Sequence, residues 1–264
     1  GFDQIDFEKK YAAIKIHFGE MGNLAFLRPN YARVVVDLIK DLGGKPFLTD
    51  ANTMYVGSRK NALDHLDTAY ENGFSPFSTG CHVIIADGLK GTDDVAVPVE
   101  GAEYCKEAYI GRAVMDADIV ISLNHFKGHE EAGFGGAIKN LGMGCGSNRG
   151  KRDMHSCGKP SVDPEKCVAC GECARNCAHD GPQLRDGKMF INQINCMGCG
   201  RCLDVCPTGA IYHNDHLAAE ILNCKMAEYA KAVVDGRPHF HISLVCDVSP
   251  YCDCHADNDL PIVP

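Results

Sequence analysis

Two copies of one cysteine motif restrict this chain more than any other feature. The runs CVACGECARNC at 167–177 and CMGCGRCLDVCP at 196–207 share the spacing C-x2-C-x2-C-x3-C, and each cysteine of the first run has its counterpart 29 residues later. Three thiolates within seven residues can surround one face of an iron–sulfur cube, and the fourth cysteine of such a run ligates the other cluster. The spacing predicts two [4Fe–4S] clusters with crossed ligands, one held by Cys167, Cys170, Cys173 and Cys206, the other by Cys196, Cys199, Cys202 and Cys177.

Structural zinc is the alternative for these cysteines. Zinc sites usually take their ligands from two separated pairs, which overlapping runs fit poorly. Gly171, Gly198 and Gly200 allow the backbone to approach a cluster and to direct amides at its sulfurs. The segment resembles a bacterial two-cluster ferredoxin domain. The second run matches fully, through CPTGAI, whereas Ala178 replaces the proline that would follow the first run.

Charge and apolar patterning narrow the class of protein. A net charge of −9 over 264 residues argues against a general binder of nucleic acid or anionic membranes. The best apolar run, at 117–123, is far shorter than the roughly 18 residues of a membrane span, and there is no signal-peptide pattern. Half of the 16 cysteines lie in the two runs, which favours metal and a reducing compartment over disulfides. We expect a cytoplasmic protein whose partner is a redox protein or a small anionic substrate.

The first half of the chain alternates strand-like and helix-like segments, which predicts an α/β fold with a mostly parallel sheet and flanking helices. Expected strands are 12–19, 45–51, 81–88 and 116–125, and expected helices are 29–44, 58–72 with Ser58 as N-cap, and 103–115. In the first helix the apolar spacing predicts a buried face of Tyr31, Val34, Val35, Leu38, Ile39 and Leu42.

After the cysteine-rich segment come an amphipathic helix at 217–236 and a strand at 239–248, which cannot form a domain alone. We therefore expect an α/β body at 1–159, an inserted α+β ferredoxin-like domain at 160–215, and a return to the body at 216–264. No closing element follows the final strand, so the body is expected to be incomplete at its C-terminus.

Polar residues stand at the carboxyl ends of the predicted strands, where open parallel sheets bind ligands. Solvated loops explain any one of them, but the set favours a site, with candidate substrate-binding residues His17, Glu20 and Asp87. Histidine titrates near neutral pH, so the catalytic candidates are His125, Lys127 and His129. On a helix, histidines four apart could bind metal, but Gly128 favours a loop. Cys252 and Cys254 are too close in sequence to form an easy disulfide with each other, so they are candidate metal ligands or redox thiols, or simply reduced thiols.

The glycine-rich stretch at 125–144 lacks the P-loop pattern and, with Ile138 at the third glycine position, the dinucleotide fingerprint. Amides of Gly133, Gly135 and Gly136, followed by a helix, could bind an anion such as carboxylate or phosphate, with Lys139 adding charge. The alternative is that these glycines only permit tight helix–sheet packing.

Seven segments together resemble the family called domain of unknown function 362, in particular its ferredoxin-containing members. They are IKIHFGEMGN (14–23), Arg28-Pro29, ADGLKGTD (86–93), NHFKGH (124–129), GFGGAIKNLGMG (133–144), the GK and MHS of 150–156, and CDC (252–254). The resemblance implies an iron–sulfur protein of bacteria or archaea and specifies no reaction. It also implies a further Asp-containing stretch after the CDC segment.

Three functions are compatible with these features. The first is a redox enzyme, or a component of one, that passes electrons between two [4Fe–4S] clusters and an anionic small molecule at the strand ends. The second is a non-catalytic electron carrier whose body docks a partner. The third is a metal- or cofactor-assembly factor that uses Cys252 and Cys254.

Overall fold

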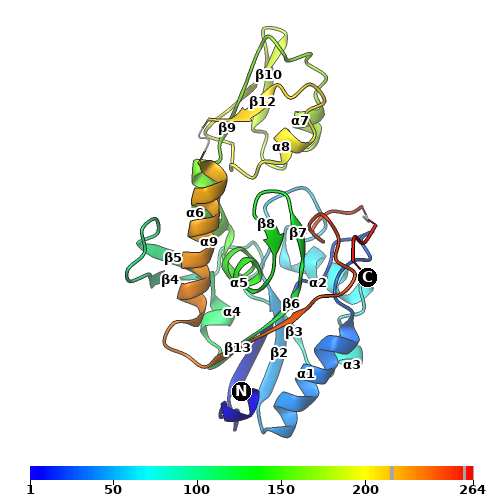
Figure 1. Cartoon of the computed structure of the whole chain (residues 1–264), viewed down its shortest axis with the longest axis vertical. Coiled ribbons are helices and arrows are strands. Elements are labelled where there is room, and N and C mark those ends of the chain that lie inside the picture. Colours follow the sequence, from blue (N-terminus) through cyan, green and yellow to red (C-terminus); the bar gives the residue numbers. More distant parts are fainter. Residues whose placement is uncertain (215–216, 258–259, 264) are drawn as a thin grey trace. The chain divides into compact units, whose positions relative to one another are not determined.

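The computed structural model describes residues 1–214, 217–257 and 260–263, which divide into two compact units (Figure 1). The first unit comprises Gly1–Thr53, Gly57–Gly150 and Lys225–Pro264. The second comprises Met54–Val56 and Lys151–Cys224. This second unit extends beyond the predicted inserted domain at both ends.

A five-stranded parallel sheet forms the centre of the first unit, so the predicted α/β class is confirmed. Its strands, in spatial order, are β13 (His239–Leu244), β6 (Ile119–His125), β1 (Tyr11–Lys15), β2 (Lys45–Asp50) and β3 (Val83–Ile85). The chain runs from β1 outwards to β2 and β3, then returns to the other side of β1 for β6 and β13. The order therefore reverses between β1 and β6, which is where sheets of this type open a crevice for ligands.

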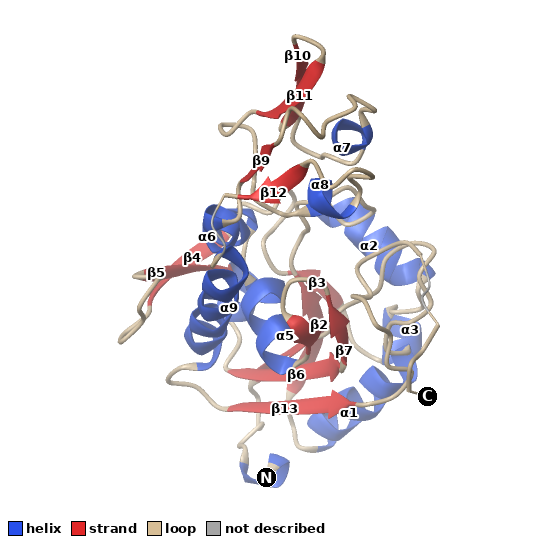
Figure 2. Cartoon of the chain, turned by 45° about the horizontal axis from the view of Figure 1, so that its top comes forward, coloured by secondary structure: helices blue, strands red, loops and turns tan. Residues whose placement is uncertain are grey.

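Helices lie on both faces of the sheet (Figure 2). Successive side chains of β1 point to opposite faces of the sheet. Ile14 joins the core that α1 (Pro29–Asp41) covers, whereas Lys15 contacts α5 (Ala137–Cys145) on the other face. Pro29 starts α1, as predicted, but the buried face is Ala32, Val35, Val36 and Ile39. Val34 is 69% exposed, which shows that the predicted buried face was rotated by about one residue. Apolar spacing alone could not separate the side chains that face the core from neighbouring apolar side chains that are exposed.

Two other local predictions were wrong. Residues 103–115 do not form one helix: β5 (Glu107–Gly111) pairs with β4 (Asp94–Pro98) as a hairpin, and only α4 (Arg112–Met115) is helical. The N-cap of α2 (Ala62–Glu71) is Asn61, whose side chain accepts from the amides of Leu63 and Asp64. Ser58 instead contacts Glu20.

The remaining elements of the first unit are short. A hairpin of β7 (Lys127–His129) and β8 (Gly133–Gly135) follows β6, and α3 (Pro76–Thr79) follows α2. The chain passes between the units within α6 (Asn148–Met154) and within α9 (Ala218–Val234). In the described parts of the chain, no helix is long and apolar enough to cross a membrane.

The second unit shows the internal repeat in its backbone. Each cysteine run leads through a left-handed glycine into one helical turn: Gly171 precedes α7 (Glu172–Arg175) and Gly200 precedes α8 (Arg201–Asp204). The antiparallel pair β9 (Pro160–Val162) and β12 (Ile211–His213) brings the two ends of the segment together, with Pro160 opposite His213. A second hairpin joins β10 (Pro182–Arg185) to β11 (Lys188–Ile191).

Candidate functional site

Lys15 ends β1 at the point where the strand order reverses, and its side chain is almost completely buried. Its Nζ lies 2.6 Å from Oδ1 of Asn140 and 2.9 Å from Oδ1 of Asp50. The Asn140 amide nitrogen in turn donates to the carbonyl oxygens of Lys15 and Leu123 and to Oδ1 of Asn124. One side chain from α5 thus ties together the ends of β1 and β6.

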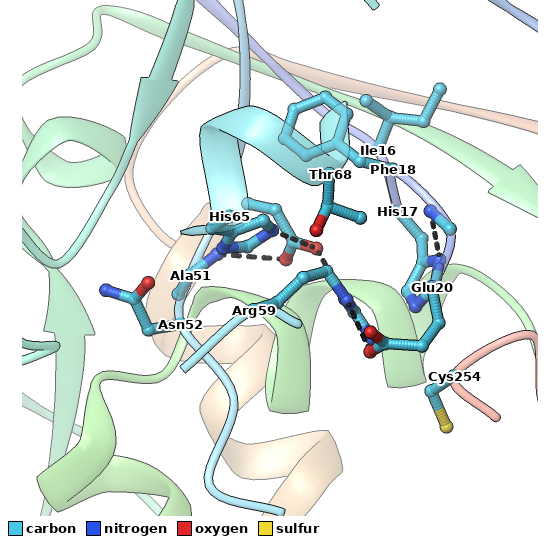
Figure 3. A network of polar contacts seen from close by, with 12 residues as sticks. Ile16, His17, Phe18, Glu20, Ala51, Asn52, Arg59, His65, Thr68 and Cys254 are labelled. Atoms are coloured by element: carbon cyan, nitrogen blue, oxygen red, sulfur yellow. Dashed lines mark hydrogen bonds and ion pairs between the residues drawn. The ribbon is translucent and has the colours of Figure 1, made fainter. Parts of the chain in front are cut away.

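Asp50, at the end of β2, is the centre of a buried ion cluster. Figure 3 labels two members of this cluster, Arg59 and His65, together with Glu20 and His17. Arg59 Nη1 lies 3.5 Å and His65 Nε2 lies 3.8 Å from Asp50 Oδ2. Burial raises the pKa of Asp50, but the attraction of Lys15, His65 and Arg59 outweighs burial and lowers it. The carboxylate is therefore ionised at neutral pH and pairs with the cationic side chains of Lys15 and Arg59.

Two predicted substrate-binding carboxylates have protein partners. Glu20 accepts from Nε of Arg59 at 3.1 Å and from the amide and hydroxyl of Ser58. Asp87 Oδ1 accepts from the backbone and side-chain nitrogens of Asn52, at 3.0 and 2.8 Å. These contacts fix the loops that follow β1 and β2.

The ring of His17 offers a hydrogen-bond donor that no acceptor in the described part of the chain satisfies. Its Nδ1 accepts from the amide of Gly19 at 3.0 Å, so the proton of the neutral ring resides on Nε2. Nε2 is buried and has no partner among the residues that the structure describes. Burial, followed by the charges of Arg59, Lys127, Lys139 and Lys15, holds the pKa of His17 well below its usual value. A neutral N–H donor thus lies within the electrostatic reach of four cationic side chains.

Residues 249–254, here named the C-terminal strap, cross the end of the β7–β8 hairpin. The amide of Gly128 donates to the carbonyl of Ser249 at 2.8 Å. Further along the strap, Oδ2 of the buried Asp253 lies 2.8 Å from His125 Nδ1 and 2.6 Å from Lys127 Nζ. His125 and Lys127 therefore lie close together, and both face a carboxylate of the chain itself.

The two strap cysteines lie side by side. The thiol of Cys254 donates to Cys252 Sγ at 2.8 Å, and Lys139 Nζ donates to the same sulfur at 3.2 Å. The hydrogen bond from Cys254 lowers the pKa of Cys252 far below its usual value, assisted by Lys139 and Lys127 against the effect of burial. The same hydrogen bond, with burial, raises the pKa of Cys254. Of the two, Cys252 is the sulfur that ionises first.

His129 has a local structural role. Its Nδ1 accepts from the amides of Glu131 and Ala132, which form the turn of the β7–β8 hairpin. Burial, followed by repulsion from Lys139, lowers the pKa of His129 to about 4. Beside it, burial opposes ionisation of Glu130, but the hydrogen bond from His255 prevails and lowers the pKa of that carboxyl to about 2. At neutral pH, His129 is therefore a neutral acceptor for the turn.

The glycine-rich stretch is a hairpin followed by a helix. Gly133 and Gly135 pair with His129 and Lys127 across the hairpin, and Gly136 precedes the first turn of α5. The tight contacts are elsewhere in the stretch: added β-carbons would meet the carbonyl oxygen of Met226 at Gly142 and the Lys15 side chain at Gly144. Tight packing, the alternative raised for this stretch, accounts for these two glycines.

In the second unit, the four cysteines predicted to hold one cluster line a single pocket with about 310 Å³ of empty volume, which includes open solvent. They are Cys167, Cys170, Cys173 and Cys206. Within the described ranges, no three His, Cys, Asp or Glu side chains gather as ligands of a single ion. Cysteines spaced around a pocket fit a cluster better than one zinc ion.

The second predicted set is also close in space. Burial, followed by repulsion from Cys199, Cys196, Cys173 and Cys177, raises the pKa of Cys202 to about 12. Such crowded thiols ionise at a cost that a cationic iron cluster would remove. Amides lie 3.4 Å from the sulfurs of Cys167, Cys177 and Cys196, which suits the bridging of amides to cluster sulfurs. The donor set therefore fits iron–sulfur clusters.

Sequence reasoning missed Lys15, Arg59 and Asn140. Lys15 did carry a signal, because it is the one charged residue inside the apolar run AAIKI. A lysine in a buried strand needs a partner, and that requirement could have marked it. Arg59 and Asn140 carried no comparable signal.

Comparison with known proteins agrees with this construction. The sequence model of the family described as "Domain of unknown function (DUF362)" matches residues 12–264. Indolepyruvate oxidoreductase subunit IorA of Methanothermobacter thermautotrophicus is 47% identical over 55 residues, which are 20% of this chain and 9% of IorA. A ferredoxin of Saccharopolyspora erythraea is 34% identical over 77 residues, 29% of this chain and 64% of the ferredoxin.

A solved Thermotoga maritima structure aligns with a TM-score of 0.45 and 12% identity, over 92% of this chain and 48% of that one. The chain thus spans less than two thirds of the length of each of these relatives. The family match covers nearly the whole chain, and the chain belongs to the DUF362 family, among its ferredoxin-containing iron–sulfur members.

Proposed function

We propose that this protein is an iron–sulfur oxidoreductase, or a component of one, that moves electrons between two [4Fe–4S] clusters and an anionic small molecule bound in the first unit. Likeness to ferredoxins and to an oxidoreductase subunit supports an iron–sulfur, redox-related role. The clusters, when bound, supply one-electron transfer. Their proposed ligands are the two crossed sets of cysteines already described.

One observation carries the anionic ligand: the buried Nε2–H of His17 has no partner among the described residues and lies within the electrostatic reach of four cationic side chains. Buried donors are normally satisfied, by protein, water or ligand. An acceptor that carries negative charge would be stabilised both by this N–H and by the surrounding cations. We therefore assign the anion to the space beside His17 at the carboxyl edge of the sheet, rather than to the hairpin amides of Gly133 and Gly135.

The residues around this position have distinct roles in the proposal. Lys127 of the hairpin and Lys139 of α5 supply positive charge, and Asp253 holds Lys127 in place. Asn140 fixes Lys15 at the strand end. His125 is not assigned proton exchange with the bound molecule in this proposal, because both of its ring nitrogens already contact protein oxygens, Asp253 Oδ2 at 2.8 Å and the carbonyl oxygen of Cys246 at 2.7 Å.

Calorimetric titration under anaerobic conditions tests the anion site, with phosphate, sulfate and acetate as probes. His17→Phe keeps an aromatic ring but removes the N–H, and it should weaken binding about tenfold or more, as expected for a hydrogen bond to a charged group. His82→Phe is the matched control, since His82 is exposed. If none of the probes binds, or both variants bind like the wild type, the carrier function replaces the enzyme.

Iron and sulfide analysis of the same sample should give about eight of each per chain.

A further inference from the structure

The structure holds a pair of sulfurs that the proposed function does not use. Cys252 and Cys254 flank one residue, their Sγ atoms are 2.8 Å apart, and the Cys252 side chain is 2% exposed while Cys254 is partly exposed. A disulfide would need these atoms to close to about 2.05 Å. Asp253 and Cys254 lie in a turn, which shortens the distance between the two cysteines relative to extended chain.

The residue between the sulfurs is anchored. Asp253 is buried and accepts from His125 and Lys127, so the middle of the strap is fixed to the end of β6 and the start of β7. The strap backbone is also held, by the hydrogen bond from Gly128 to Ser249. Formation of the bond therefore requires the two Sγ atoms to approach from 2.8 Å to about 2.05 Å, while Asp253 keeps the strap attached to β6 and β7.

Lys139 balances the negative charge of the reduced pair. Its Nζ lies 3.2 Å from Cys252 Sγ, and the partial burial of this contact strengthens the attraction relative to water. A thiolate beside an ammonium is the stabilised form of an attacking or leaving sulfur. Cys254, which stays protonated, supplies the second sulfur and the only proton that must move.

A metal site fits these two sulfurs less well. Across the described parts of the chain, no third His, Cys, Asp or Glu completes a ligand group with them. In addition, the ammonium of Lys139 already occupies a position against Cys252 Sγ and would repel a metal cation.

We propose that Cys252 and Cys254 form a two-electron dithiol–disulfide centre whose reduced form is held by Lys139. In the oxidative direction the S–S bond forms, Cys254 loses its proton, and two electrons leave. In the reductive direction the S–S bond breaks, two electrons enter, Cys252 becomes the thiolate, and one proton is taken up by Cys254. The oxidant or reductant is a pair of [4Fe–4S] clusters, one electron each, or a small thiol–disulfide couple.

The assignment of the electrons to clusters rests on the proposed function, whereas the disulfide itself does not. The pair would then serve as a store in which two single electrons are combined before a two-electron reaction. Oxidation would also remove the negative charge beside Lys139 and leave that ammonium free to attract an anion at the neighbouring position beside His17.

The test is a redox titration of the cluster-loaded chain in anaerobic glutathione and dithiothreitol buffers, followed by acid quench, alkylation and trypsin. Cys246, Cys252 and Cys254 share the peptide that follows Lys231, because the Arg237–Pro238 bond resists cleavage. We expect this peptide to pass from three alkylated cysteines to one, as a single two-electron transition. Cys254→Ser should instead keep Cys246 and Cys252 alkylated in every buffer, and Cys246→Ser should leave the midpoint of the transition unchanged.

Lys139→Met tests the positioning of the thiolate. Loss of the ammonium destabilises the reduced form, so the equilibrium should move at least about tenfold towards disulfide, which is about 30 mV for a two-electron couple. Lys139→Arg, which keeps the charge, should restore most of the shift. The proposal fails if the peptide keeps three alkylated cysteines in every buffer, or if bound metal protects both thiols. Because the titration uses no anion and an added redox couple, failure of anion binding at His17 leaves its outcome unaffected.

Discussion

The carbonyl oxygen of Pro250 lies 1.8 Å from the position that a β-carbon on Gly128 would occupy. Two backbones are therefore in direct contact, β7 of the hairpin and the C-terminal strap. This contact lets Asp253 reach Lys127 and Cys252 reach Lys139. Gly128, within the glycine-rich stretch, is thus required by the position of the strap.

Gly128→Ala should displace the strap, because a methyl group cannot fit against a backbone carbonyl at that distance. We expect a loss of about 1–3 kcal/mol in the free energy of unfolding, as for other overpacking substitutions, and faster alkylation of Cys252. Gly135→Ala is the matched control across the hairpin, since its β-carbon would meet only ordinary contacts, the nearest at 3.6 Å. Equal effects of the two substitutions on Cys252 would contradict the role of Gly128.

Cys177→Ala tests the crossed ligation. Although Cys177 belongs to the first run, its proposed cluster is the one held by Cys196, Cys199 and Cys202. The variant should lose or degrade that cluster and keep the pocket of Cys167, Cys170, Cys173 and Cys206 filled. Iron analysis with electron paramagnetic resonance of the reduced protein gives the count, and a crystal structure shows which cluster remains. If the variant instead keeps the cluster of Cys196, Cys199 and Cys202 and loses the other one, the assignment is refuted.

The α/β class followed from patterns that act along the chain: apolar runs for strands, and caps and stops for α1. The long-range contacts of the site could not be predicted from such patterns. Lys15, Arg59 and Asn140 meet through strand order, and strand order depends on which neighbours pair, which one sequence does not reveal. The hairpin at 94–111 was missed for a related reason, since a short exposed hairpin has little apolar periodicity to separate it from a helix.

Lys15→Met tests the buried ion cluster through its acid sensitivity. Removing one partner from a buried pair typically costs about 3–5 kcal/mol. The native pKa of Asp50 is lowered, so its ionisation stabilises the fold above its unfolded pKa of about 4 and this contribution is lost as pH falls through the native value. Without Lys15 the pKa rises, and acid unfolding should begin at higher pH.

Circular dichroism between pH 2 and pH 7 measures that transition. Lys10→Met is the control, because Lys10 is exposed immediately before β1. If both variants unfold at the pH of the wild type, Lys15 does not stabilise the Asp50 carboxylate.

His129→Asn separates the structural role of this histidine from its titration. The native pKa is about 4 and the unfolded value is near 6.5, so both states are neutral above pH 7 and histidine protonation does not affect stability there. Between pH 6.5 and pH 4 the unfolded chain binds a proton that the folded chain does not bind, so the stability of the wild type decreases as the pH falls, by up to about 3 kcal/mol.

Asparagine does not titrate, and its side-chain oxygen can accept from the amides of Glu131 and Ala132 in place of Nδ1. Urea unfolding from pH 8 to pH 4 should therefore give curves for the two proteins that run parallel above pH 7 and converge or cross below pH 6. Parallel curves over the whole range would mean that His129 titrates alike in the folded and unfolded chain, and that it is open to protonation in the native site.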